Sequence, residues 1–85
     1  MVPNYKAYNT KEKGVYVSVD SNYFKISDAK EVYRNSLDNK CKDDSILLEV
    51  TNEKLKKKIV VISIGVRDAE AIALALLHLC HSIKD

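Results

Sequence analysis

The sequence contains few of the residues on which many enzymes and secreted proteins depend. Gly14 and Gly65 are its only glycines, so it has no glycine-rich loop that could hold a phosphate. Two cysteines, Cys41 and Cys80, are too few for a disulfide framework, which indicates a reduced, cytoplasmic protein. We expect Cys80, which lies in an apolar segment, to be a small residue of the core.

Arginine is also scarce. Arg34 and Arg67 are two of fourteen basic residues, and the formal net charge is +2. Because reading of guanine edges usually depends on the planar fork of arginine, this composition disfavours sequence-specific DNA recognition. We expect neither a signal peptide nor a membrane span, because the first ten residues are polar and the one long apolar segment contains Glu70 and two histidines.

No pattern of catalytic or metal-binding residues stands out. Cys80 is followed by His81, but sequence neighbours on a helix point in different directions and cannot form a nucleophile–base pair. His78 and His81 are three residues apart, yet a zinc site needs three or four ligands and no third has suitable spacing. We therefore expect no enzyme, no cofactor and no metal.

What is present is a set of strand and helix patterns that fit one domain. We predict an N-terminal arm or edge strand over residues 1–13, with an edge strand through Tyr5 and Ala7, and a single α+β domain over residues 14–85. Three valines alternate onto one face of the first strand of that domain. In chain order the predicted elements are a strand at 15–19, a turn at 20–22, a short return strand at 23–26, a helix from Asp28 to about Asp38 capped by Ser27, a strand at 46–50, a turn at 51–55 and a strand at 56–64.

The end of the chain completes the predicted fold. A helix follows Gly65, from Ala69 to about Ile83, with Asp68 as its N-cap. The preceding strand is apolar at both odd and even positions, so we expect it to be central and covered on both faces. The predicted fold is α+β, with the order ββαββα, a mostly antiparallel sheet of four to five strands, and the last helix packed on that sheet.

The last helix is apolar on two sides. Its sheet-facing stripe is predicted to contain Ile72, Leu76, Leu79 and Ile83. The opposite side contains the leucine patch, which we define as Leu74 and Leu77 with Ala73, His78 and His81. Either the first helix or the N-terminal arm covers this patch, or the patch is a contact with a partner or with a second copy.

A group of lysines gives an alternative function. Lys54, Lys56, Lys57 and Lys58 gather at the entrance to the long strand and form what we call the lysine hairpin. Together with four tyrosines, at positions 5, 8, 16 and 23, they could bind single-stranded nucleic acid without sequence preference. Alternate lysines on a strand point to opposite faces, however, and charges at a strand end also protect an edge, which is the interpretation that we favour.

One local segment resembles a known family. The run Ile62-Ser63-Ile64-Gly65 followed by Asp68-Ala69-Glu70-Ala71-Ile72-Ala73-Leu74-Ala75-Leu76 resembles the strand-to-helix segment of the bifunctional nuclease domain family. The resemblance covers about a fifth of the chain, and the family's domain continues well beyond this helix. We carry no nuclease activity over from it.

These observations favour a small, non-enzymatic protein-interaction module with a regulatory or inhibitory role. A core of this size is thin, so association with a second copy would help its stability, and we expect a homodimer. The partner could be met by the lysine hairpin or by the polar loop over residues 39–44. Non-specific binding of single-stranded nucleic acid is the alternative.

Overall fold

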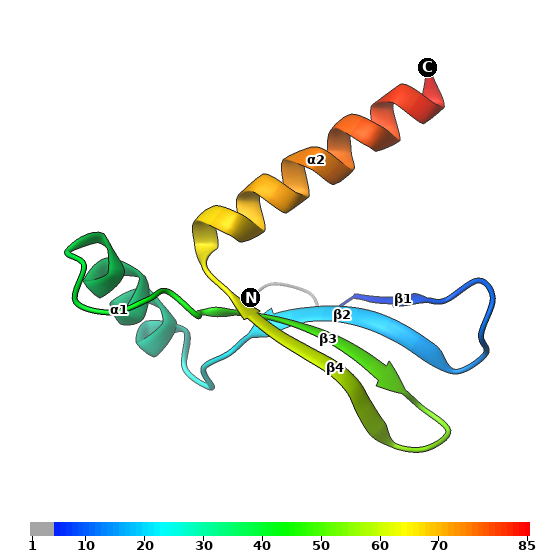
Figure 1. The fold of residues 1–85 in the computed structure, drawn as a ribbon, viewed down its shortest axis with the longest axis horizontal. Coiled ribbons are helices and arrows are strands. Elements are labelled where there is room, and N and C mark those ends of the chain that lie inside the picture. The colour runs from blue at the N-terminus through cyan, green and yellow to red at the C-terminus, as the bar shows by residue number, and fades with distance from the viewer. Residues whose placement is uncertain (1–4) are drawn as a thin grey trace.

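The computed structural model describes residues 5–85 as two β-hairpins, each followed by a helix (Figure 1). The first four residues of the predicted arm lie outside the described part. Both helices adjoin the same end of the sheet, and the two hairpin turns lie at the other end. In chain order the elements are β1 Lys6–Tyr8, β2 Val15–Ser21, α1 Ile26–Leu37, β3 Ile46–Asn52, β4 Lys57–Ile64 and α2 Val66–Lys84.

The strands form one antiparallel sheet in the order β1-β2-β3-β4. This confirms the predicted α+β class and the order ββαββα. The prediction that the longest strand is central was wrong, because β4 lies at the edge of the sheet and, within residues 5–85, pairs with β3 alone. Its apolar residues on both faces therefore do not mean that it is covered on both faces.

The first hairpin differs from the prediction. No strand forms at residues 23–26. The strand that forms the first hairpin with β2 is β1, which precedes it in the chain. The Ser21 hydroxyl donates to the carbonyl oxygen of Tyr23 at 2.9 Å, and the Tyr23 N–H donates to the same hydroxyl at 3.2 Å. This local bonding bends the chain, and α1 then begins at Ile26 with Lys25, not Ser27, at the N-cap.

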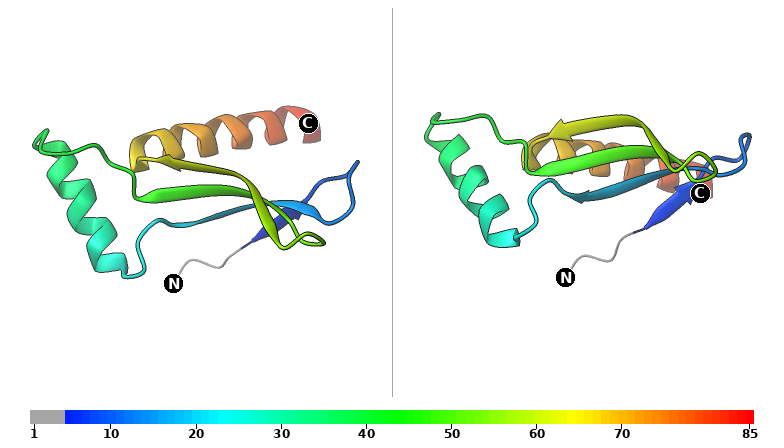
Figure 2. Two further views of the ribbon diagram at one scale, coloured as in Figure 1. Left: turned by 60° about the horizontal axis from the view of Figure 1, so that its bottom comes forward. Right: turned by 90° about the horizontal axis from the view of Figure 1, so that it is seen from below.

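The last helix also begins earlier than predicted. A single residue, Gly65, separates the end of β4 from α2, and Asp68 lies in the first turn of the helix and is not its N-cap. The expected packing of α2 on the sheet of its own chain is absent, since none of its residues is buried. Figure 2 shows α2 running along one side of the sheet without settling on it. Cys80, predicted to be in the core, is exposed.

The molecule is less compact than most proteins of its length. Its radius of gyration is 14.9 Å, whereas a compact chain of this length has one of about 12 Å. Within residues 5–85, only two apolar residues, Val15 and Ala29, are buried. The hydrophobic residues that the sequence supplies for a core are therefore mostly on the surface of the single chain.

Three consecutive residues, Asp43 to Ser45, join the end of β2, the beginning of β3 and the beginning of α2 at one end of the sheet. We call them the 43–45 junction. The Asn22 N–H donates to the carbonyl oxygen of Ser45 at 2.9 Å, and the Tyr23 hydroxyl donates to the Asp44 carboxylate at 2.7 Å. The Asp43 carboxylate accepts from the Val66 N–H at 2.8 Å. The end of β2, the beginning of β3 and the first turn of α2 are thus joined at one place.

Asp43 sets the direction in which α2 leaves the sheet. Its carboxylate also accepts from the Ser45 N–H at 3.0 Å, so it is held on both sides. Gly65 lies so close that an added Cβ would be 3.0 Å from the Asp43 carbonyl oxygen. Partial burial acts to raise the pKa of Asp43, but hydrogen bonds from Ser45 and from the Val66 backbone outweigh it, and this pKa lies below its usual value.

We predict that Asp43→Asn destabilises the fold by about 0.5–2 kcal/mol at neutral pH, the range for loss of a helix-capping side chain. Because the folded-state pKa is lowered, the contribution of the carboxylate is present above the unfolded pKa of about 4 and is lost as the pH falls through the folded value. Chemical unfolding at pH 7 and at progressively lower pH should show the wild type and the variant converging.

Glu12→Gln removes the same charge from an exposed loop and is the control. It should leave the free energy of unfolding within about 0.5 kcal/mol of the wild type. An Asp43→Asn variant as stable as Glu12→Gln at pH 7 would contradict the role given to this carboxylate.

Candidate functional site: an apolar wedge

The strand register gives the sheet two different faces. Residues paired across an antiparallel sheet point to the same side, and Val19, Leu48 and Ile62 form one such row. The neighbouring row, Ser18, Glu49 and Val61, points to the other side. The apolar sheet face, as we call it, comprises Ala7, Val17, Val19, Ile46, Leu48, Val50, Val60, Ile62 and Ile64.

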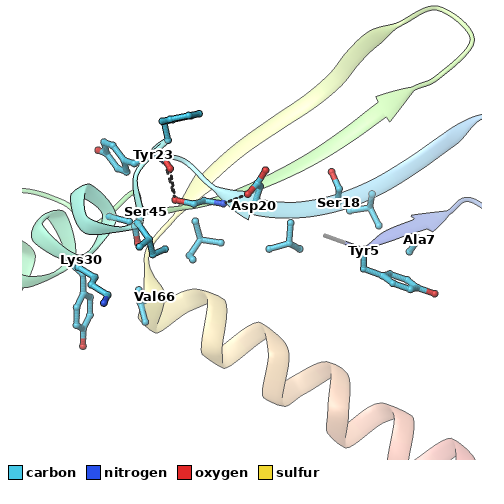
Figure 3. Close-up of a pocket in the computed structure, with 16 residues that line it drawn as sticks. Tyr5, Ala7, Ser18, Asp20, Tyr23, Lys30, Ser45 and Val66 are labelled. Carbon is cyan, nitrogen blue, oxygen red and sulfur yellow. Dashed lines mark hydrogen bonds between the residues drawn. The ribbon is translucent and has the colours of Figure 1, made fainter. Parts of the chain in front are cut away.

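This face is not covered in the single chain. Val17 and Val19 are 44 % and 53 % exposed, and Val60 and Ile62 are 42 % and 48 % exposed. A sheet with one apolar and one polar face normally packs its apolar face against another layer. Here α2 stands on that side of the sheet but diverges from it (Figures 2 and 3). The space between them, bounded by the apolar sheet face and α2, is the apolar wedge.

A cavity of about 1050 Å³ adjoins the wedge and is lined by residues of β1, β2, the β2–α1 connection, α1 and the beginning of β3, with Val66 of α2. Figure 3 shows Ser45 and Val66 where β4 passes into α2, with Tyr5 and Ala7 further along the sheet. Apolar groups dominate the lining, which takes in valines of β2 and the connection between β2 and α1. Phe24, in that connection, is fully exposed. A fully exposed phenylalanine beside an uncovered apolar face is typical of a contact that another chain completes.

The leucine patch is exposed to solvent, as is nearly all of α2. Leu74 is 63 % and Leu77 is 53 % exposed, and Ala73, His78 and His81 are also exposed. Neither α1 nor the described part of the N-terminal segment covers them. The stripe predicted to face the sheet is equally exposed, with Leu76 at 58 %. The helix therefore presents two apolar sides, and its own chain covers neither.

The histidines of α2 are exposed on the helix surface. No group of three histidine, cysteine or acidic side chains comes together within residues 5–85. The Ser82 hydroxyl donates to the backbone carbonyl of His78 at 3.0 Å, a bond that stays within the helix. His78 and His81 are thus surface groups at the border of the leucine patch.

The lysine hairpin is brought together but is partly neutralised. Lys54 and Lys56 lie in the turn, and the ammonium group of Lys58 forms a 3.1 Å ion pair with Glu49 on the polar side of the sheet. Lys57 pairs with Asn52 in a row whose side chains point to the apolar side of the sheet. This agrees with the alternation of side chains along a strand.

The tyrosines do not form one stacking surface. Tyr8 and Tyr16 lie with ring centroids 5.3 Å apart, and the ammonium of Lys6 is 4.9 Å from the Tyr16 ring. Tyr8 donates to the Glu53 carboxylate at 3.0 Å, and this bond raises the pKa of Tyr8. Tyr23 is bound to Asp44 at the other end of β2, and Tyr5 lines the wedge.

The polar loop over residues 39–44 has an internal role at its end. Asp43 and Asp44 accept hydrogen bonds from α2 and from the β2–α1 connection, so these two carboxylates are engaged within the chain. The sequence interpretation missed this role and also missed the apolar sheet face. The period-2 pattern of β2 was the available signal, but which residues of β4 share its face depends on the register.

Comparisons of the chain with protein-family models, with curated proteins and with solved structures gave no match. Across residues 5–85, neither helix has the length and apolar character needed to span a bilayer. The wedge is therefore interpreted from its own chemistry alone.

Proposed function

We propose that this protein is a small, non-enzymatic, cytoplasmic interaction module with a regulatory or inhibitory role, and that it binds another protein chain through the apolar wedge. The observation that carries the proposal is a sheet face of nine apolar or small residues, on which Val17, Val19, Val60 and Ile62 are each more than 40 % exposed. Contiguous apolar surface of this kind usually marks an interaction site.

The chemistry of the wedge supports a protein ligand. Its aliphatic side chains lie on strands, where paired backbone bonds fix their positions. Phe24 in the β2–α1 connection and Ile26 at the beginning of α1 are exposed beside them. Burial of one valine, leucine, isoleucine or phenylalanine side chain stabilises a complex by about 1.5–3 kcal/mol. A protein segment with apolar residues on one side could therefore gain substantial free energy here without any charged contact.

We predict that tagged wild-type protein captures a defined set of proteins from its native host and that Val19→Glu abolishes this capture. A carboxylate on the apolar sheet face would be buried without a partner in the complex, which is strongly unfavourable. Capture followed by mass spectrometry, with the two proteins compared quantitatively, is the measurement.

Ser18→Glu is the matched control, because Ser18 is adjacent in β2 but lies on the polar face. It should retain the captured set. If Val19→Glu and Ser18→Glu capture the same proteins as the wild type, the wedge is not the binding surface and the proposal fails.

A second candidate function has one observation in its favour. Lys6, Tyr8 and Tyr16 stack at the sheet end that also carries the lysine hairpin, which combines positive charge with aromatic rings. Single-stranded nucleic acid binds to such surfaces through charge and stacking. Glu49 and Glu53 lie among these groups and reduce their positive charge, so we rank this function second.

If the second function holds, the protein should retard single-stranded oligonucleotides at low salt, and the affinity should fall steeply as salt is added, because counterion release drives such binding. The triple variant Lys56→Glu, Lys57→Glu, Lys58→Glu should abolish the retardation, whereas Val19→Glu should not affect it. We expect no retardation, which would remove this function from consideration.

A further inference from the structure

We propose that the chain which fills the apolar wedge is a second copy of this protein, and that two copies exchange their α2 helices so that each α2 lies on the apolar sheet face of the other. This inference rests on the proposed function, since it names the occupant of the same surface. It would leave the polar sheet face and the lysine hairpin free for a further protein.

The exposed area is the right size for such a dimer. The chain has an accessible surface of 7330 Å². A compact monomer of 9.6 kDa has about 5,100 Å² by the usual scaling with mass. The excess is about 2,200 Å² per chain, or roughly 4,400 Å² for two copies, which is within the 2,000–5,000 Å² that obligate homodimers bury.

The connection to α2 disfavours coverage of the sheet by its own helix. Only Gly65 separates β4 from α2, whereas connections between helices and strands commonly have about two to six residues. The first turn of α2 is held by the hydrogen bond from the Val66 N–H to Asp43. For α2 to settle on its own sheet, it would have to rotate at Gly65 and disturb that bond. A second chain can fill the wedge without this change.

A reciprocal exchange covers both exposed surfaces with one interface. The apolar sheet face and α2 belong to the same chain, so a two-fold axis that places α2 on the partner's sheet also places the partner's α2 on this sheet. Each α2 would then lie between the partner's sheet and the partner's α2. This arrangement uses both apolar sides of the helix: the stripe containing Ile72, Leu76, Leu79 and Ile83 against the sheet, and the leucine patch against the other helix.

The sequence of α2 is self-complementary in an antiparallel pair. A two-fold axis midway between Ala75 and Leu76 places Leu74 beside the partner's Leu77 and Ala73 beside the partner's His78, a small residue next to a large one. The same axis places Glu70 beside the partner's His81. The same axis places Arg67 in the first turn beside the partner's Lys84 in the last turn, so the packing of apolar side chains, and not charge pairing, would hold the two helices together.

The oligomeric state tests the inference. We expect wild-type protein to have twice the 9.6 kDa chain mass by light scattering after size-exclusion chromatography at micromolar concentration. Leu74→Glu and Val19→Glu should shift it to the monomer mass, because each would bury a carboxylate against apolar side chains. Ser82→Glu and Ser18→Glu should remain dimers, because Ser82 lies between the two apolar sides of α2 and Ser18 lies on the polar sheet face.

A wild-type monomer at 100-fold higher concentration, or dimers for all four variants, would overturn the inference. The outcome is separable from that of the proposed function. A monomer that still captures a host protein through Val19 leaves the proposed function intact and excludes the second copy. A dimer that captures no host protein other than its own copies supports the exchange and counts only against a regulatory or inhibitory role toward a different protein.

Cross-linking tests the exchange itself and does not require a variant to dissociate. In a background of Cys41→Ser and Cys80→Ser, we would mix one chain that has Leu76→Cys with a differently tagged chain that has Val17→Cys or Val19→Cys. A short bismaleimide should give a mixed-tag product with at least one of the sheet cysteines, and Ser18→Cys should give none. If Leu76→Cys and Val19→Cys in a single chain link only within that chain, α2 covers its own sheet and the exchange is wrong.

Discussion

The open arrangement of this molecule depends on the contact between the Asp43 carboxylate and the first turn of α2. The Val66 N–H donates to that carboxylate at 2.8 Å, and the connection from β4 to α2 has only one residue. A connection this short leaves few directions for the helix, and the hydrogen bond selects among them. Since α2 begins at the end of an edge strand, its direction decides whether the apolar sheet face is covered.

The same constraint explains why the hydrophobic residues of the chain do not form a core. Eighty-five residues would ordinarily place one helix against the sheet to cover the apolar face. The 43–45 junction holds α2 away from that position and also fixes the end of β2 through Asn22 and Tyr23. The apolar surface is thus rigidly presented, because its side chains lie on paired strands. Rigid apolar surface loses little conformational entropy on binding, which favours a role in association.

The two glycines serve different purposes in this arrangement. Gly14, at φ +81°, closes the β1–β2 hairpin in a conformation that other residues rarely adopt. Gly65 has an ordinary extended conformation, and its importance is the close approach of Asp43, which any side chain at this position would have to displace. Gly65 therefore has a packing role at the beginning of α2.

The sequence by itself determined most of the helices and strands of this protein, although the strand expected at residues 23–26 does not form. Alternating valines specified β2, the uninterrupted apolar run specified a long strand ending at Ile64, and the spacing of leucines specified α2, because strand and helix periodicities are local properties. It also indicated two apolar sides on α2. It misplaced the beginnings of both helices, because Lys25 and Gly65 occupy N-cap positions without any capping side chain that could be recognised. Only the tertiary structure decided that β4 is an edge strand, that Val19 and Ile62 share a face, and that Asp43 reaches Val66. These depend on strand register and on contacts between residues far apart in the chain, which no local pattern encodes.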